Sequence, residues 1–268
     1  MKTAISILIL AVLMVWFSTL GEAANLDGLL LYLPFDEGTG KQAKDLSPNG
    51  YHGTLMAAKW ADGKFGGAVE FDGSGHVAVG PLADQPLSLD EFTIEFWFNP
   101  GKKLDTNSPR TDIVYALNGC CRPHITYNRA KQLPPGVIGF YPEFGEEAKP
   151  DAGPGIPLGT KRTNFASNTW YHFAATANSK EAKLYLDGEF QSQVNAPKPK
   201  LRLTYREHGI SIGASQGKAN FYTGKIDDFR LWSRVLTDDE IQQFATIGLG
   251  VEGKDKLAMT WGAIKSMR

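Results

Sequence analysis

The sequence predicts an all-β protein: a two-sheet antiparallel β-sandwich with one short helix near its C-terminal end. Between Phe92 and Phe98 apolar and polar residues alternate, so that the phenylalanines and Ile94 share one face, as in a half-buried strand. Asp187 and Gly188 lie between two strand-like runs and are typical of a two-residue hairpin turn. The 29 glycines, the many aromatic residues and the scarcity of helix-forming runs favour short strands joined by tight turns.

Further strands are predicted where short apolar runs are bounded by turn residues. In chain order these runs are residues 29–35, 68–71, 76–79, 112–117, 125–127, 137–141, 170–176, 183–190, 209–213 and 225–232. Asp72 and Gly73 are typical of a hairpin turn, which predicts that the strands on either side of them pair with each other. Residues 45–55 are predicted to form a loop that turns most tightly at Asn49 and Gly50.

The predicted helix follows Thr237. This residue is typical of an N-cap, and Glu240 three positions later completes the pattern of a capping box. Leu236 and Ile241 occupy the positions of a hydrophobic staple, and Gly248 is expected to end the helix.

The first 23 residues have the organisation of a signal peptide. Lys2 precedes an uninterrupted apolar run at residues 4–17, and small or polar residues follow up to an expected cleavage after Ala23. The apolar run is shorter than the roughly 18 residues that span a bilayer, which disfavours a retained anchor. We therefore expect a secreted or extracytoplasmic protein, with no membrane insertion after cleavage of the signal peptide.

The remainder is expected to be one domain, residues 24–250, with a C-terminal extension at residues 251–268. The net charge of −1, with both signs interspersed, indicates no nucleic-acid partner. Cys120 and Cys121 are adjacent and cannot link distant strands, so the fold must depend on its core. A vicinal disulfide, free thiols and an intermolecular link remain open for this pair.

Four stretches have the order and spacing of a known family. Residues 32–55, 60–72 and 92–100, and finally 170–189 together with 224–241, resemble the laminin G-like jelly roll of the concanavalin A-like lectin/glucanase superfamily. The resemblance implies a jelly-roll sandwich for residues 24–250. It does not fix the function, because these motifs are mostly turns and core strands. Residues 105–159 depart from the family pattern by their length and their cysteines.

The resemblance also implies a structural calcium ion. Asp45 and Asn49 lie in a predicted turn and Asp227 lies on the last strand, and Ca²⁺ takes about six to eight oxygen ligands of this kind. Because the first and last strands are neighbours in this fold, we expect Asp45 and Asp227 to converge. The alternative is that Asp45 caps a turn and Asp227 pairs with Arg230. The five histidines are scattered without the spacing of a transition-metal site.

The aromatic residues of the atypical region suggest a binding surface. Tyr115, Tyr127, Tyr141 and Arg129 are the predicted ligand-binding residues, because aromatic faces stack on sugar rings and neighbouring polar groups orient hydroxyls. The alternative is that these tyrosines belong to the core.

Catalytic motifs are not found in the sequence. Glu91 and Glu95 share one face of a predicted strand, but the central aspartate of the family's glycosidase motif is missing, and a solvent-facing structural role is the alternative. No nucleophile motif, phosphate-binding loop or dinucleotide fingerprint is present. We therefore predict a secreted, non-catalytic binding or adhesion module that recognises a carbohydrate or an extracellular protein surface. A structural envelope or matrix element and a divergent glycoside hydrolase are the alternatives.

Overall fold

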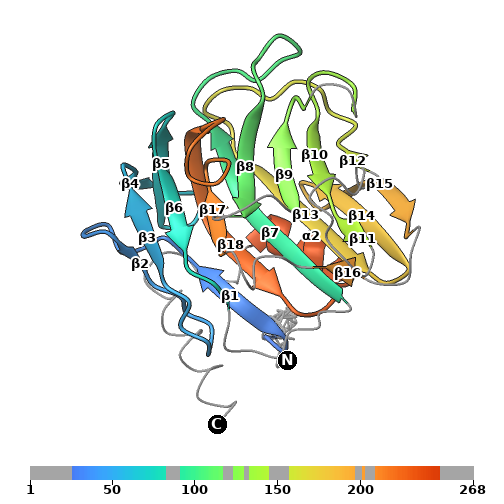
Figure 1. Ribbon diagram of the computed structural model, residues 1–268, viewed down its shortest axis with the longest axis horizontal. Helices are drawn as coiled ribbons and strands as arrows, with labels where there is room; N and C mark the ends of the chain where they lie inside the picture. Colours follow the sequence, from blue (N-terminus) through green and yellow to red (C-terminus); the bar gives the residue numbers. More distant parts are fainter. Residues whose placement is uncertain are drawn as a thin grey trace, which may run out of the picture.

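Two antiparallel sheets form the body of the protein (Figure 1). The computed structural model describes residues 26–82, 91–116, 123–129, 133–144, 157–196, 201–202 and 209–247. Each of the two main sheets has eight strands, and a helix, α2 (Asp238–Ile247), follows the last strand. The predicted all-β sandwich with one C-terminal helix is therefore confirmed.

The first sheet is built around β7 and β18. In spatial order its strands are β15 (Glu189–Asn195), β14 (Glu181–Leu186), β13 (Tyr171–Asn178), β7 (Glu91–Pro100), β18 (Thr223–Trp232), β5 (Gly67–Asp72) and β4 (Lys59–Asp62), with β1 (Leu29–Leu33) also paired to β18.

The second sheet contains the strands of the atypical middle region. In spatial order they are β12 (Leu158–Gly159), β10 (Ile138–Tyr141), β9 (His124–Tyr127), β8 (Thr111–Ala116), β17 (Ile210–Ile212), β6 (His76–Val79), β3 (Gly53–Met56) and β2 (Gln42–Ala43). A separate two-stranded ribbon joins β11 (Glu143–Phe144) to β16 (Leu201–Arg202).

The core between the sheets confirms which β7 side chains point inward, but the expected half-burial is wrong, because the opposite face of β7 is buried as well. Its inward side chains, Phe92, Ile94, Phe96 and Phe98, are fully buried. The ring of Phe96 stacks on Phe173 of β13, with a centroid separation of 5.2 Å. Because β7 lies between β13 and β18, this apolar row forms the centre of the core.

The expected hairpin at Asp72 and Gly73 is wrong. β5 pairs with β18 in the first sheet, whereas β6 pairs with β17 and β3 in the second. The turn therefore carries the chain from one sheet to the other. A tight turn specifies a change of direction, and the partner strands decide in which sheet each arm lies. The second hairpin is confirmed: Asp187 and Gly188 both have positive φ, 52° and 78°, between the paired strands β14 and β15.

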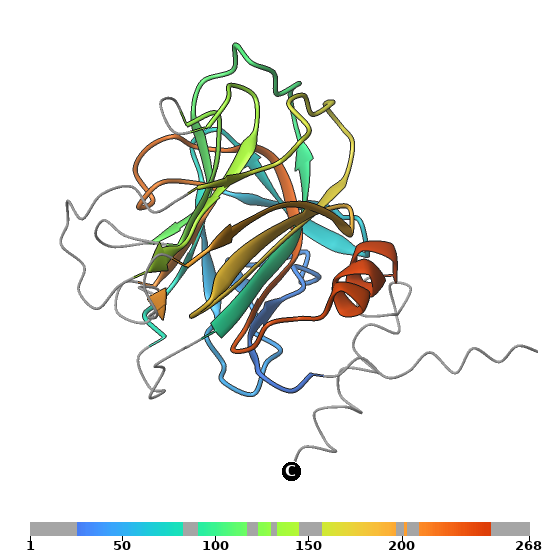
Figure 2. The same cartoon turned by 90° about the vertical axis from the view of Figure 1, so that its right-hand side faces the viewer.

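Helix α2 lies beside the sandwich, on the outer face of the first sheet (Figure 2). Its capping box is confirmed, since Thr237 N donates to Glu240 Oε2 at 2.8 Å and Glu240 N donates to Thr237 Oγ1 at 3.2 Å. The staple residues Leu236 and Ile241 are buried in a second apolar cluster, where Trp232 of β18 also lies. The helix therefore closes a small second core.

An irregularity divides β18 into two parts. Asp228 has a φ of 50°, and the register of β18 against β7 shifts between Asp227 and Arg230. Before this bulge one edge of β18 pairs with β5, and after it the same edge pairs with β1. The bulge thus lets one strand join two partners, and it places Asp227 and Arg230 on the same outer face.

Several predictions lie outside the described residues. These are the signal peptide at residues 1–23, the pair Cys120 and Cys121, the helix-ending Gly248 and the extension at residues 251–268. Within the described part of the chain, no helix has both the length and the apolar character to cross a membrane.

Candidate functional site

A stack of three aromatic rings lies on the outer face of the second sheet. Along β9, Ile125 and Tyr127 enter the core, so His124 lies on the opposite face. Tyr141 of β10 is its register partner. The His124 ring stacks on Tyr115 with a centroid separation of 5.0 Å and on Tyr141 with a separation of 4.6 Å. The strand register thus brings together residues that are distant in the sequence.

Arg129 completes this stack. Asn128 adopts a left-handed conformation, φ 53°, directly after β9, and the chain turns there. The guanidinium carbon of Arg129 then lies 4.8 Å from the centroid of the Tyr141 ring, and Nη1 contacts His124 Nε2. A guanidinium can only donate, so His124 accepts at Nε2. Burial and the nearby charge of Arg110 both lower the pKa of Arg129.

A second arginine directly precedes the neighbouring strand, β8. Arg110 donates from Nε to Asp112 Oδ1 at 3.0 Å and from Nη2 to Asp112 Oδ2 at 2.8 Å, which is a bidentate pair. Asn220 also donates to Asp112 Oδ2, at 2.8 Å. The Asp112 side chain is fully buried, and this burial raises its pKa while the charge of Arg110 opposes the shift.

The two arginines line one open cleft of about 620 Å³. We call it the Arg110–Arg129 cleft; its lining residues are Thr106, Ser108, Pro109, Arg110, Asn128, Arg129, Leu133 and Pro135. The wall therefore combines cations, hydroxyls and an amide with three apolar side chains.

The region behind Leu133 is closely packed and polar. A Cβ on Gly139 would lie 2.5 Å from Leu133 Cδ1 and 2.7 Å from Tyr141 Cε2, so only glycine lets these side chains approach. The hydroxyls of Tyr141 and Thr126 are both buried and close enough to interact with each other. Burial raises the pKa of Tyr141, and the charge of Arg129 opposes this effect.

Three of the four residues predicted to bind a ligand therefore lie together. Tyr115, Tyr141 and Arg129 share the stack, in which both tyrosines are themselves buried. Tyr127 is fully buried in the core between the sheets, with its ring edge-on to Phe165 at 6.0 Å. The alternation along β9 explains this difference, because residues 125 and 127 share a face.

Arg110 and Asp112 were not among the predicted site residues. Arg110 directly precedes β8 and Asp112 lies within it, and a charged pair two residues apart at the start of a strand was the signal that the sequence offered.

The predicted calcium residues are engaged in other contacts. Asp45 Oδ1 accepts the backbone N–H groups of Tyr32 and Ser47, and Oδ2 accepts the Tyr51 N–H and the Ser47 hydroxyl. Four donors therefore point at this carboxylate, as in the turn-capping alternative. Asn49 donates from its amide nitrogen to Leu30 O at 2.8 Å.

Asp227 has different neighbours. Its Oδ2 accepts the N–H groups of Lys64 and Phe65 at 2.8 and 3.0 Å, and Arg230 donates instead to Asp228 and Glu95. Among the described residues, no group of three or more acidic, histidine or cysteine side chains has the arrangement of a metal site. Asp45, Asn49 and Asp227 do not fit a shared calcium site in this arrangement. Calcium binding by the protein stays a prediction.

Glu95 is not on a solvent-facing surface. Its side chain is fully buried and accepts from Arg230 Nη1 and Trp232 Nε1, both at 3.1 Å, on the face of β7 that α2 covers. Arg230 is also paired with Asp228 at 2.8 Å. A general acid must reach its substrate. Glu95 is instead part of a buried ion network, so it is unsuited to that role.

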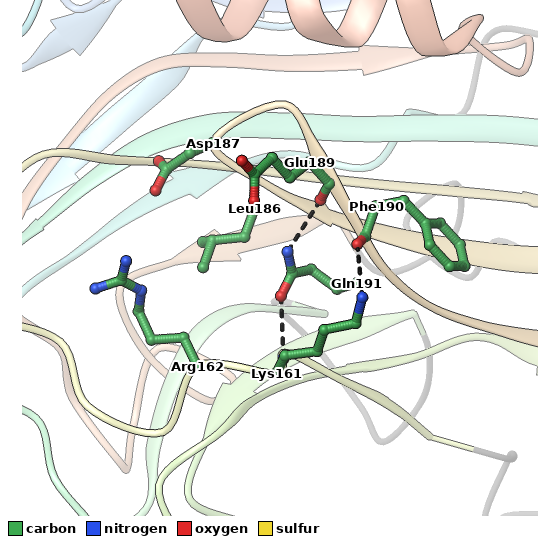
Figure 3. Close-up of a pocket in the computed structure, with 7 residues that line it drawn as sticks. All are labelled: Lys161, Arg162, Leu186, Asp187, Glu189, Phe190 and Gln191. Atoms are coloured by element: carbon green, nitrogen blue, oxygen red, sulfur yellow. Dashed lines mark hydrogen bonds between the residues drawn. The ribbon is translucent and has the colours of Figure 1, made fainter.

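A second cleft, of about 490 Å³, lies at the tip of the β14–β15 hairpin (Figure 3). The Gln191 side chain is held between the backbone of Lys161 and that of Glu189, at 3.0 and 3.1 Å. The cations Lys161 and Arg162 are balanced there by Asp187 and Glu189. With its charges balanced and its amide occupied, this cleft offers fewer groups to a ligand than the Arg110–Arg129 cleft.

Comparison with known proteins identifies the family. A laminin G-type family described as the concanavalin A-like lectin/glucanases superfamily matches residues 71–242, well over half of the chain. The chain belongs to this superfamily. It is also 35% identical over 85 residues to the human adhesion G-protein coupled receptor D1, which covers 30% of this chain and 10% of the receptor.

Solved structures share the architecture at low sequence identity. Domain 4 of AbnA, an extracellular arabinanase of Geobacillus stearothermophilus solved with arabinotriose, is 16% identical over 81% of this chain and 98% of that domain, with a TM-score of 0.54. The binding domain of botulinum neurotoxin DC, solved with SialylT, is 16% identical over 81% of this chain and 50% of its own, with a TM-score of 0.59. At such identities the likeness concerns the fold.

Proposed function

We propose that the protein is an exported, non-catalytic carbohydrate-binding module whose site is the Arg110–Arg129 cleft. The observation that carries the proposal is that Arg129 is held against Tyr141 and His124 in the wall of an open cleft. A fixed donor beside apolar surface is what a sugar site requires, because less conformational freedom is lost on binding. The arabinotriose bound to the AbnA domain supports carbohydrate as the ligand class.

The aromatic stack is not available for direct contact with a sugar ring. His124 covers one face of the Tyr141 ring and the Arg129 guanidinium lies over the ring as well. The faces of the Tyr141 ring are therefore covered by protein side chains and cannot stack on a sugar. Recognition in the cleft then depends on donors from the arginines and Asn128, with apolar contact from Pro109 and Leu133. Tyr115 and Tyr141 act as supports that position the donors.

Export and the absence of catalysis are part of the same proposal. The predicted signal peptide supports export. The burial of Glu95 in an ion network supports a non-catalytic role, because it leaves the glycosidase alternative without the carboxylate on which it was based.

Affinity electrophoresis through gels that contain soluble polysaccharides tests the proposal. We expect at least one polysaccharide to retard the purified protein, and we expect Arg129→Gln to weaken that retardation. Arg162→Gln is the matched control, because Arg162 also packs over a tyrosine, 5.3 Å from the ring of Tyr171, outside the cleft. If no polysaccharide retards the protein, or if both variants lose binding equally, the proposal fails.

Protein recognition is a second candidate, favoured by one observation. Phe190, the second residue of β15, is 44% exposed and is a large apolar side chain at the rim of the cleft in Figure 3. Large exposed aromatic side chains are enriched in protein interfaces. Chemical crosslinking of the protein in its native surroundings distinguishes carbohydrate recognition from protein recognition. A single dominant protein partner that is lost in Phe190→Ser, without dependence on sugar, would favour this second function.

A further inference from the structure

The charges of the Arg110–Arg129 cleft do not balance. Two guanidiniums line it, and the carboxylate that faces them is Asp112. Arg110 takes both oxygens of Asp112 in its bidentate pair. Among the described residues, no carboxylate forms an ion pair with Arg129. The cleft therefore carries an excess of one positive charge at its wall.

Asp112 also acts on Arg129 through its charge, but one carboxylate can offset only one of the two guanidiniums. Its side chain is fully buried and accepts two bonds from Arg110 and one from Asn220, and its backbone N–H donates to Asn220 O at 2.9 Å. Moving it toward Arg129 would break the bidentate pair with Arg110 and leave the buried carboxylate with fewer donors. The excess charge is thus fixed by the fold.

The position of Arg129 is also fixed. The Tyr141 ring supports the guanidinium, and His124 accepts a hydrogen bond from Nη1. Asn128 anchors the adjoining loop, because its Oδ1 accepts the Gly136 N–H at 3.1 Å. A preorganised guanidinium matches an oxyanion with little loss of side-chain entropy. Repulsion between the two arginines is relieved when an anion lies between them.

We infer that the cleft selects polysaccharides that carry an oxyanion, either a carboxylate or a sulfate. Arg129 is the main residue that binds the oxyanion, and Arg110, which Asp112 holds in place, adds a second positive charge beside it. This inference rests on the proposed function and narrows it from carbohydrates in general to acidic ones. Pro109, Leu133 and Pro135 contact the apolar face of the adjoining sugar, while Thr106 and Ser108 border the same cleft.

Two matched pairs of polymers test the inference by affinity electrophoresis at low and moderate salt. Dextran sulfate is compared with dextran, and polygalacturonate with its fully methyl-esterified form. We expect retardation by an acidic member and not by its neutral counterpart, and we expect retardation to weaken as salt rises. The sulfate pair and the carboxylate pair distinguish the two sources of the oxyanion.

Substitutions in the cleft test whether the acidic polymers bind there. Arg129→Gln should weaken binding to the acidic polymer by at least about tenfold, since a hydrogen bond to a charged group is lost, while Arg162→Gln should bind as the wild type does. Thr106→Glu adds a negative charge at the exposed rim of the cleft without touching the stack, and it should weaken binding in the same way. Thr169→Glu, on an exposed position elsewhere, is its control.

The outcomes separate the inference from the proposed function. Retardation by neutral polymers, with no preference for the acidic partners, overturns the inference and leaves carbohydrate binding intact. Acidic binding that persists in both Arg129→Gln and Thr106→Glu also overturns the inference, because the anion then binds elsewhere. Absence of retardation by any polysaccharide overturns the proposed function itself.

Discussion

The guanidinium of Arg230 donates to Glu95 Oε1 at 3.1 Å, and neither side chain is exposed to solvent. Asp228 accepts from the same guanidinium at 2.8 Å, and the rings of Tyr32 and Phe244 lie 5.1 and 5.2 Å from it. Strands β1, β7 and β18 and helix α2 therefore meet at one buried cation. The buried ion network beneath α2 therefore connects all four elements.

We expect Glu95→Ala to destabilise the protein by about 3–5 kcal/mol, because it leaves the buried charge of Arg230 with an incomplete set of partners. Urea unfolding followed by tryptophan fluorescence measures this change. Glu91→Ala, an exposed position on the same strand, is the control and should change the free energy of unfolding by less than about 0.5 kcal/mol. Similar losses in the two variants would contradict a structural role for the network.

The same network predicts a dependence on pH. Burial by itself would raise the pKa of Glu95, but the charge of Arg230 and the contact with His172 outweigh it and hold the pKa below its usual value. Because the folded-state pKa is depressed, the contribution to stability is complete above the unfolded pKa of about 4.3 and is lost as pH falls through the folded value. The difference in unfolding free energy between wild type and Glu95→Gln should therefore be constant above about pH 5 and shrink below about pH 4. A difference that grows on acidification would exclude this linkage.

Helix α2 depends on its cap. Thr237→Ala removes the oxygen that accepts the Glu240 N–H, and we expect a loss of about 1 kcal/mol. Thr246→Ala, near the other end of the helix, removes a hydroxyl that bonds back to Gln242 O at 2.8 Å. That control should cost less, because such a bond adds little to helix stability. Thermal unfolding of both variants checks the prediction, and equal losses would count against the capping box as the determinant.

Gly139 connects packing to the candidate site. An alanine there would force Leu133 and the Tyr141 ring apart, so we expect Gly139→Ala to weaken polysaccharide binding severalfold with a loss of stability of about 1–3 kcal/mol. Gly80→Ala is the matched control, because a Cβ at that exposed position meets nothing within 4 Å. Electrophoretic retardation and thermal unfolding measure the two effects. Unchanged binding in Gly139→Ala would remove Tyr141 from the support of the site.

Calcium is tested by the melting temperature with and without added CaCl₂. The calcium prediction requires a rise, whereas the four hydrogen bonds that Asp45 already accepts favour its turn-capping role. A cation that binds the native state alone would raise the melting temperature by mass action. A rise that disappears in Asp227→Asn would support the calcium prediction, and no rise would contradict it.

Local sequence patterns predicted several elements of the fold correctly. The alternation along β7, the turn at Asp187 and Gly188 and the capping box at Thr237 each involve residues within a few positions of one another. Such features depend on short-range backbone preference, so the sequence reveals them directly. The hairpin expected at Asp72 failed because choosing a sheet requires partners from distant parts of the chain.

The sequence identified only some residues of the candidate site, because their contacts also depend on pairing between distant strands. An aromatic-rich region with Arg129 was visible in the sequence, but the register of β8, β9 and β10 determined that Tyr115 and Tyr141 meet His124 and that Tyr127 enters the core. The bulge at Asp228 likewise determined which aspartate pairs with Arg230.

By itself, the sequence determined an all-β sandwich with a capped helix, because strand alternation, turn chemistry and capping are local. Only the tertiary structure decided which side chains share a face, which charges are buried beneath α2 and that Arg110 and Arg129 line one cleft. Those outcomes depend on pairing between distant strands, and a shift of one residue in register would move each of these side chains to the opposite face.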